Sequence, residues 1–431
     1  MNKRFSVIFL LLSAVVAGYA QGGTDSPYSQ YGLGILAEQS QGFSRGMNGV
    51  GVALRQGNIA NTLNPASYSA IDSLTMIFDV AMSGQRTNFK EGGISSNASQ
   101  AYFEYAVGTF RLMPNVGLSF GLLPYSSVGY NYTSETFLDT TNGTVTETYT
   151  GTGGLRQLFV GAGWRVFKPL SVGVNIAYLW GNYNRSVTTS SSTYINSLSK
   201  TYSATVNSYI LQAGVQWEQA LGHGSSLTVG ATGSLGHKLG ADPECSIMNV
   251  NSVTSTRDTT IYSVSNGLSL PTTVGLGLGY NHRGKLFVEA DATYQKWGSV
   301  DMPSYDAETG SYTLRSGLLK DRYKVNVGAD FVPSSTSRRY FNRVHYRIGA
   351  GYATPYVKVN GKDGPKEVSI SAGFGLPLQN TWNTRGNLRP VLNISAQWAR
   401  SSATGLITEN VFRINLGLTF NERWFAKWKV D

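Results

Sequence analysis

The sequence predicts an all-β fold: a 14-stranded antiparallel transmembrane β-barrel with an N-terminal hatch segment in the lumen. Three observations lead to this prediction. Apolar residues alternate with small or polar ones along most of the chain, turns of two lengths separate the alternating runs, and the composition is rich in glycine but poor in charge. Glycine accounts for 50 of 431 residues and charged residues for 14%, whereas soluble proteins average about 7% and about 25%.

The composition also excludes several classes of protein. After the first 20 residues no apolar run reaches the roughly 18 residues that a membrane-spanning helix needs, which excludes a helical transporter. The 25 Tyr, 18 Phe and 8 Trp are spread along the chain, which excludes a disordered protein. The formal net charge of +10 is scattered, so we expect no nucleic-acid binding.

The N-terminus predicts the compartment. Lys3 and Arg4 precede an apolar stretch that ends at small residues, with Gly18 and Ala20 at the positions typical of a cleavage site. Residues 1–20 therefore read as a signal peptide, and we expect the chain to be exported to the outer membrane of a Gram-negative cell. Cys245 is the single cysteine, which excludes an internal disulfide.

The alternating runs distinguish a membrane barrel from a soluble β-sandwich or barrel, the competing interpretation. In residues 170–178 every second residue is apolar, and the residues between them are Ser, Gly, Asn or Ala. Surface strands of a soluble protein would carry Lys, Glu and Thr at those positions, whereas a lumen accepts small residues and a few charges. The same pattern recurs at 116–122, 274–280, 286–294, 323–331 and 412–420.

The strand number follows from the connections. Six short turns can be placed at 111–114, 167–169, 219–225, 281–285, 333–343 and 376–388, and seven longer polar segments at 89–99, 133–146, 187–200, 239–259, 298–320, 357–365 and 399–409. Thirteen connections join fourteen strands, an even number as single-chain outer-membrane barrels require. We therefore expect a barrel over 74–431 with a C-terminal tail at 421–431, short turns in the periplasm and long loops outside the cell.

Residues 21–73 do not alternate cleanly. A segment of about fifty residues with glycine-rich turns is too small to build its own core, so it must bury its apolar residues against another part of the chain. The lumen of a fourteen-stranded barrel with small inward side chains has room for it.

This segment carries a resemblance to a known family. The stretch from Phe43 to Gly46, the pattern Gly49-x-Gly51-x-Ala53, and Asn64-Pro65-Ala66 directly before the first strand resemble the hatch of the FadL/toluene-transport family. That resemblance implies an outer-membrane transport protein that takes up hydrophobic solutes, such as long-chain fatty acids, through a hatch-gated barrel. The positions that it marks for gating are Asn64, Pro65, Ala66, Gly46, Gly49 and Gly51.

Two segments depart from the transporter pattern. The motif from Ser26 to Gly34 and the tail at 421–431 resemble a divergent branch of FadL-like barrels in bacteria of the Bacteroides type. Some barrels of that branch serve a protein-secretion translocon, so the alternative function is a structural partner or plug of an outer-membrane, type IX-like translocon. The expected partners are outer-membrane lipid, a hydrophobic small-molecule ligand and, in the alternative, a translocon protein.

Charged residues on the predicted lumen face have two possible roles. Arginines there could grip a carboxylate ligand, but acids and bases are interspersed on neighbouring strands, which favours ion pairs with one another and with the hatch. The turn at Asn64-Pro65 could likewise either control a ligand path or only aim the chain into strand one. The lumen candidates are Asp79, Glu104, Glu289, Asp291, Lys324, Asp330, Arg347 and Arg413.

No motif indicates an enzyme. Gly117-x-Ser119-x-Gly121 matches a hydrolase pattern, but it lies within a predicted strand rather than at a strand-to-helix turn. The four histidines, His223, His237, His282 and His345, show neither metal-ligand spacing nor a carboxylate partner in motif register. We therefore expect no catalytic residue, metal or cofactor.

Overall fold

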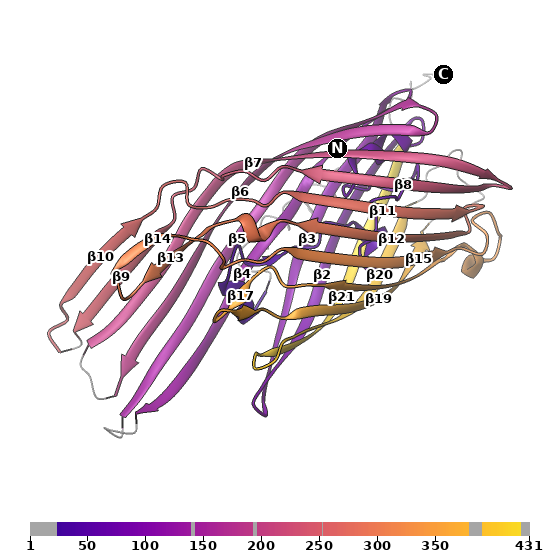
Figure 1. The fold of residues 1–431 in the computed structure, drawn as a ribbon. Coiled ribbons are helices and arrows are strands. Elements are labelled where there is room, and N and C mark those ends of the chain that lie inside the picture. Colours follow the sequence, from indigo (N-terminus) through magenta and orange to yellow (C-terminus); the bar gives the residue numbers. More distant parts are fainter. Residues whose placement is uncertain (1–23, 139–142, 193–195, 252, 379–389, 424–431) are drawn as a thin grey trace, which may run out of the picture.

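The computed structural model describes residues 24–423 except 139–142, 193–195, 252 and 379–389 (Figure 1). Fourteen of its strands form an antiparallel barrel that closes where the first pairs with the last, so the predicted fold is confirmed. The barrel strands are β2 (Thr75–Glu91), β3 (Ile94–Met113), β4 (Val116–Leu138), β5 (Gly143–Phe167), β6 (Leu170–Ser191), β7 (Asn196–Gly222), β8 (Ser225–Ser234), β11 (Thr273–His282), β12 (Leu286–Gln295), β15 (Arg322–Phe331), β16 (His345–Ala353), β19 (Lys366–Pro377), β20 (Val391–Ser402) and β21 (Thr408–Arg423).

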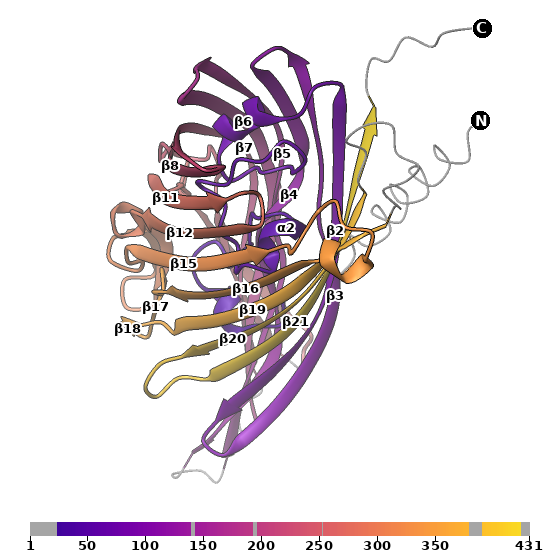
Figure 2. The ribbon, with the colours of Figure 1, turned by 90° about the vertical axis from the view of Figure 1, so that its right-hand side faces the viewer.

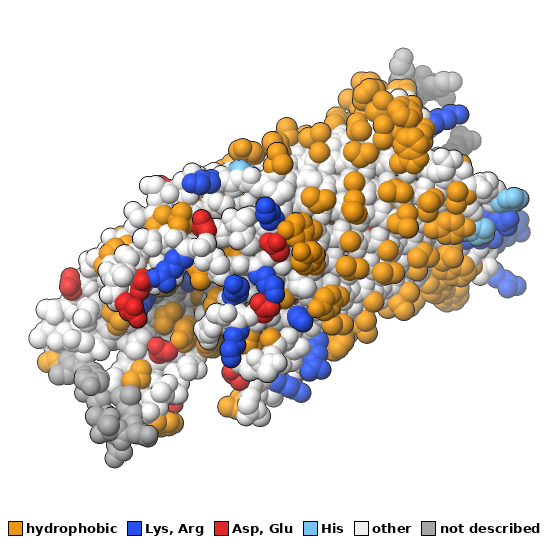
Figure 3. Space-filling view, in the orientation of Figure 1, with side chains coloured by type: hydrophobic (Ala, Val, Ile, Leu, Met, Phe, Trp, Pro, Cys, Tyr) orange, Lys and Arg blue, Asp and Glu red, His pale blue; other side chains and the backbone are white. Residues whose placement is uncertain are grey.

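The alternation in the sequence corresponds to two faces of the wall. On β6 the side chains of Val174, Ile176 and Tyr178 are more than half or about half exposed, while Asn175 is buried inside. Figure 3 shows the resulting band of hydrophobic side chains around one half of the barrel. Among the described residues no helix combines the length and the apolar character that crossing a membrane requires.

The four longest strands extend far beyond what the membrane requires. The strands β4, β5, β6 and β7 have 23, 25, 22 and 27 residues, whereas a tilted strand crosses a bilayer in about 9–11. The segments 133–146 and 187–200, predicted as loops, are therefore mostly strand, and that prediction is wrong. Their Thr, Ser and Tyr residues favour strands, and each hairpin keeps its ladder outside lipid.

Two further segments predicted as loops also contain hairpins. Segment 239–259 includes β9 (Glu244–Asn251), which pairs with the outer part of β7 and with β10 (Arg257–Ser263). Segment 298–320 forms the hairpin of β13 (Met302–Asp306) and β14 (Ser311–Arg315), next to a short turn η4 (Trp297–Ser299). A smaller pair, β17 (Lys358–Val359) with β18 (Lys362–Asp363), follows β16, and η5 (Tyr340–Arg343) lies in the turn before it.

One seam of the wall is not closed along its length. β3 pairs with β4 only between Ala106 and Met113, and residues 94–105 pair with β2 alone. The outer part of β4 pairs with β5. On its other edge Ser126 and Ser127 pair with the short strand β1 (Ile35–Leu36), Tyr125 accepts the N–H of Ala37, and the Ser29 hydroxyl bonds the backbone of Gly129. The two hairpins diverge toward their tips in Figure 1. We call the edges 94–105 and 128–138 the open seam.

Residues 24–74, the hatch, lie inside the barrel (Figure 2). They form η2 (Pro27–Gln30), β1, α2 (Gly42–Arg45) and η3 (Pro65–Ala70), joined by irregular backbone. Two buried hydrophobic clusters lie between these elements and the inner face of the wall, and a third, larger one joins Leu33 of the hatch to wall strands and to long-loop segments that include Leu268, Trp297 and Tyr356. The core of this protein is therefore the lumen, filled by its N-terminal segment and, on the long-loop side, by residues of the loops.

Candidate functional site

A ring of inward-facing glycines seats the hatch. A Cβ added to Gly117 would overlap the backbone of Tyr68, one at Gly163 or Gly173 would overlap Pro65, and one at Gly230 would overlap Val52. Similar contacts continue around the wall at Gly214, Gly277, Gly328 and Gly349, and Gly373 and Gly417 face Gly46 and Gly42 of the hatch. The glycines that the composition revealed thus allow hatch backbone to approach wall backbone directly.

Asn64 and Pro65 form the cap of η3. The Asn64 side chain accepts a hydrogen bond from the Ala66 amide at 3.1 Å, and it donates to the carbonyl oxygens of Val52 at 2.8 Å and Val215 at 3.1 Å. Pro65 occupies the first position of η3, where its missing N–H costs nothing. The fully buried Asn64 therefore joins two parts of the hatch to β7.

The predicted gating glycines follow α2 and contact both the wall and the hatch itself. Gly46 packs against the side chain of Arg347, and Gly49 has a φ of +80°, which a residue with a Cβ rarely adopts. Gly51 donates its N–H to the Asp291 carboxylate at 2.7 Å. These positions hold a tight turn against the wall, which the sequence motif alone did not reveal.

Glu289 and Asp291 on β12 bind hatch backbone rather than basic side chains. Asp291 accepts the N–H groups of Gly51 and, at 3.0 Å, Val52, and Glu289 accepts that of Ala53. Their cross-strand neighbours include glycines on β11 and β15, which leave room for the hatch chain. Charge-assisted bonds to backbone N–H groups are stronger than neutral ones, so this carboxylate pair anchors the centre of the hatch.

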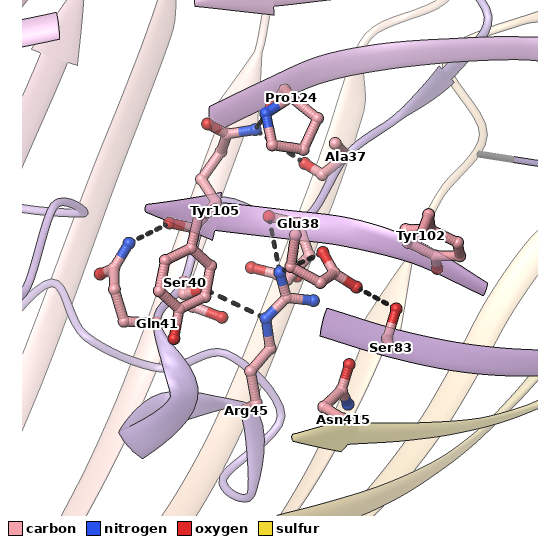
Figure 4. A network of polar contacts seen from close by, with 12 residues as sticks. Ala37, Glu38, Ser40, Gln41, Arg45, Ser83, Tyr102, Tyr105, Pro124 and Asn415 are labelled. Atoms are coloured by element: carbon pink, nitrogen blue, oxygen red, sulfur yellow. Dashed lines mark hydrogen bonds and ion pairs between the residues drawn. The ribbon is translucent and has the colours of Figure 1, made fainter. Parts of the chain in front are cut away.

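Arg45 of α2 makes the most buried ion pair of the hatch (Figure 4). Its Nη2 lies 2.8 Å from Glu104 Oε2 on β3, and both side chains are 4% exposed. The same guanidinium donates to the carbonyl oxygens of Ser40 and Glu38, each at 3.0 Å. Ser83 on β2 donates to the second oxygen of Glu104 at 2.7 Å. One arginine therefore links α2, the preceding loop and two wall strands.

Lys324 on β15 forms an ion pair with Glu38 of the hatch. Burial raises the pKa of the Glu38 carboxyl, but the charges of Lys324 and Arg45 outweigh burial and lower it to about 2. Sequence reasoning identified Lys324 and missed its partner Glu38, as it missed Arg45, because neither lies on an alternating strand. The position of Arg45 inside the quoted hatch motif was the signal that could have found it.

Asp330 and Arg347 form the cross-strand ion pair that the sequence favoured. Arg347 Nε lies 2.9 Å from Asp330 Oδ1 on the neighbouring strand. Its guanidinium also stacks over the Phe43 ring at 4.1 Å, which joins the pair to the hatch. His345 Nδ1 lies 2.8 Å from Asp330, a carboxylate partner that no sequence motif indicated because fifteen residues separate the two.

The remaining lumen candidates have neutral partners. Asp79 accepts a hydrogen bond from the Tyr105 hydroxyl at 3.1 Å, and that hydroxyl accepts the N–H of Gly42. Arg413 donates to the side-chain oxygen of Gln85 at 2.8 Å. The eight charges predicted from the sequence therefore do not gather into one ligand site. Within the described residues no group of three or more His, Cys, Asp or Glu side chains could hold a metal ion.

A cavity of about 670 Å³ lies beside the hatch, next to the open seam. Phe103 and Glu104 of β3 line it on the seam side, together with Leu122–Pro124, Ser126 and Ser127 of β4. Its lining also includes four basic and four acidic side chains, which are Arg156, Arg322, Lys324, Arg413, Glu38, Glu104, Glu367 and Glu409. On the long-loop side an apolar cluster that contains Leu33, Trp297 and Tyr356 fills the lumen.

Comparisons with known proteins agree with this architecture. The chain resembles the Ralstonia pickettii toluene transporter TbuX with 15% identity and a TM-score of 0.62, over 90% of this chain and 99% of that one. It resembles a Pseudomonas aeruginosa FadL homologue with 12% identity and a TM-score of 0.61, over 90% and 99%. It resembles the Pseudomonas putida toluene transporter TodX with 15% identity and a TM-score of 0.58, over 91% of this chain and 100% of that one.

At this level of identity these likenesses establish the fold. No curated protein matches the sequence. A family model described as BamG matches residues 1–431, the whole length of the chain. The chain is therefore a member of the BamG family, and it has the 14-stranded barrel fold of the FadL-like outer-membrane proteins.

Proposed function

We propose that this protein is a hatch-filled outer-membrane barrel that serves as a partner subunit of an outer-membrane protein-secretion assembly. The observation that carries the proposal is the open seam. Residues 94–105 of β3 and 128–138 of β4 present strand edges that no ladder of the described chain pairs. Unpaired strand edges are sites at which another chain adds a strand.

The composition of the seam supports this role. Natural proteins protect free edges with lysine, proline or bulges. Residues 94–105 and 128–138 contain neither lysine nor proline, and the β2–β3 ladder has one bulge there, at Glu104. The edge of β4 already accepts one added strand, since Ile35 and Leu36 of the hatch pair with Ser127 and Ser126. An edge that binds an extended segment of its own chain has the geometry to bind one from a partner.

The interior of the barrel supports the same role. Hatch backbone seats against wall glycines, and the remaining cavity carries eight charged side chains. A site for an apolar solute is normally lined by hydrophobic and aromatic side chains with few polar groups. A rigid, filled barrel is suited to act as a membrane-anchored scaffold.

The test is purification of the full-length chain, tagged, from native outer membrane in mild detergent. We expect it to elute as a stoichiometric complex with other outer-membrane proteins. Ser134→Lys, which places a charge on the free edge of β4, should dissociate the complex. Asn184→Lys on β6, at an exposed residue that pairs with Thr152 of β5 and Ser203 of β7, should not. Elution as a lone barrel would overturn the proposal.

A second candidate function is uptake of a hydrophobic solute, which the position of the cavity beside the open seam favours. A solute could pass from the cavity through the wall where β3 and β4 separate. The relatives with this fold include proteins described as toluene transporters. Uptake of labelled fatty acid or toluene should then fall in a deletion strain and recover with the wild-type chain. Equal uptake in both strains would exclude this function.

A further inference from the structure

The described short turns of the barrel carry basic residues and no acidic ones, although Asp72 before β2 and Glu218 near the end of β7 lie at the same end. Five of its turns are described, at 111–116, 165–170, 219–225, 282–286 and 332–344, and they contain no Asp or Glu. Their lysines and arginines are Arg111, Arg165, Lys168, Arg283, Lys285, Arg338, Arg339 and Arg343. We call the exposed members of this set, Lys168, Arg283, Lys285, Arg338 and Arg339, the basic rim.

The opposite end of the barrel is different. Its extended hairpins and loops carry both basic and acidic side chains. Some of these form ion pairs, such as Lys320 with Asp363 and Arg315 with Asp306. Figure 3 shows this asymmetry: blue and pale blue side chains stand without red ones at the short-turn end, whereas blue and red side chains are mixed on the other half. The net positive charge is therefore greatest at the short-turn end, although the total excess of the chain is modest.

Apolar side chains fix the level of the basic rim relative to the membrane. Lys168 directly follows Phe167, whose side chain is 50% exposed, and Arg339 lies two residues before Phe341, which is 75% exposed. Trp217 and Leu221 are exposed at the end of β7, where Figure 3 shows the hydrophobic band ending. Aromatic side chains with this exposure lie at the boundary between hydrocarbon and headgroups.

The turns that carry the rim are joined to one another. Arg283 donates from Nε to the carbonyl oxygen of His223 at 3.1 Å, and its backbone N–H donates to the carbonyl of Gly224 at 2.9 Å. The turn after β11 is therefore held against the turn after β7. Guanidinium and ammonium groups are thus presented from three turns, 165–170, 282–286 and 332–344, just beyond the hydrocarbon boundary.

We propose that the basic rim binds anionic phospholipid headgroups of the periplasmic leaflet. The short-turn side of a single-chain outer-membrane barrel faces the periplasm, where the leaflet consists of phospholipids whose phosphates lie at the level of the rim. Guanidinium groups bind phosphate oxygens in bidentate fashion, and lysine adds a point charge. An acidic protein is the weaker fit, because the lipid-exposed Phe167 and Phe341 hold the rim at the bilayer surface.

The experiment uses the full-length chain in nanodiscs made of phosphatidylcholine and phosphatidylglycerol, followed by release into the gas phase and mass analysis of retained lipid. The wild type should retain phosphatidylglycerol in preference to phosphatidylcholine, and added salt should weaken that preference. A variant with Lys168→Gln, Arg283→Gln, Lys285→Gln and Arg339→Gln should lose the preference about tenfold or more, since each Lys or Arg near an anionic surface is worth roughly fivefold.

The matched control neutralises four exposed basic residues at the long-loop end. The combination of Lys238→Gln, Arg257→Gln, Lys296→Gln and Lys362→Gln changes the net charge equally and should leave lipid preference within about twofold of wild type. Equal retention of both lipids by the wild type would overturn the proposal. An unchanged lipid preference in the rim variant would also overturn it. If that variant instead loses a bound periplasmic protein, the partner of the basic rim is an acidic protein and not a lipid.

Discussion

Replacement of Arg45 by methionine should release the hatch from the wall. The guanidinium of Arg45 is the partner of the Glu104 carboxylate and of two hatch carbonyl groups, all in the lumen. Methionine keeps much of the side-chain volume but supplies no hydrogen-bond donor. The variant therefore leaves a buried carboxylate whose described partner is the Ser83 hydroxyl.

The magnitude follows from the burial of the pair. Removal of one member of a buried ion pair costs about 3–5 kcal/mol, and both side chains here are 4% exposed. At about 1.4 kcal/mol for each factor of ten, the equilibrium for local opening of the hatch should rise about 150-fold to about 5,000-fold. The exposed pair of Lys320 and Asp363 provides the contrast, because such pairs contribute about 0–1 kcal/mol.

The assay is amide hydrogen exchange, read by mass spectrometry, on the full-length protein in nanodiscs. Protection of residues 41–54 should fall by the factor above in Arg45→Met while β4–β7 keep theirs, and Lys320→Met should change it less than tenfold. Addition of Glu104→Gln to Arg45→Met should restore part of the protection, since the buried charge is removed. Less than a tenfold loss in Arg45→Met, or an equal loss throughout the barrel, would refute the reasoning.

Three further predictions concern the seat of the hatch. Gly173→Ala should lower the stability of the folded protein by about 1–3 kcal/mol, and with it the melting temperature, because the added Cβ overlaps Pro65. Gly84→Ala is the control: its Cβ would meet its nearest atom at 4.0 Å, so the melting temperature should change little. Asn64→Ala should reduce the protection of the hatch in hydrogen exchange by about 1–3 kcal/mol. The change leaves the buried carbonyl groups of Val52 and Val215 without the Asn64 donor and the Ala66 N–H without its acceptor. Because the folded-state pKa of Glu38 is lowered from 4.5 to about 2, its ion pair stabilises above pH 4.5 and is lost as the pH falls toward 2; that decline in hatch protection should be absent in Glu38→Gln.

The fold could be predicted because its signals are local. The alternation at residues 170–178, for example, predicts which face of the strand meets lipid, and the short turns predict where the strands end. Segments outside the membrane were harder to predict. Residues 187–200 lack an apolar face, so their pairing depends on the neighbouring hairpin strands and not on a pattern within the segment.

The partners of the lumen charges could be predicted only in part. Asp330 and Arg347 are cross-strand neighbours, so strand order was sufficient to propose their ion pair. Glu289 and Asp291 bind hatch N–H groups about 240 positions away. Such contacts depend on how an irregular segment crosses the lumen, and no periodicity in the sequence encodes that path.

The sequence by itself determined that this chain is a barrel, how many strands it has and which residues face lipid, because backbone hydrogen bonding and burial impose a period of two on every strand. Only the tertiary structure decided what fills the barrel. The inward glycines were visible in the composition, but their purpose depends on hatch backbone lying directly against them. The open seam and the basic rim likewise arise from strand pairing and from turns brought to one end, so residues distant in sequence acquire a shared function only in the folded wall.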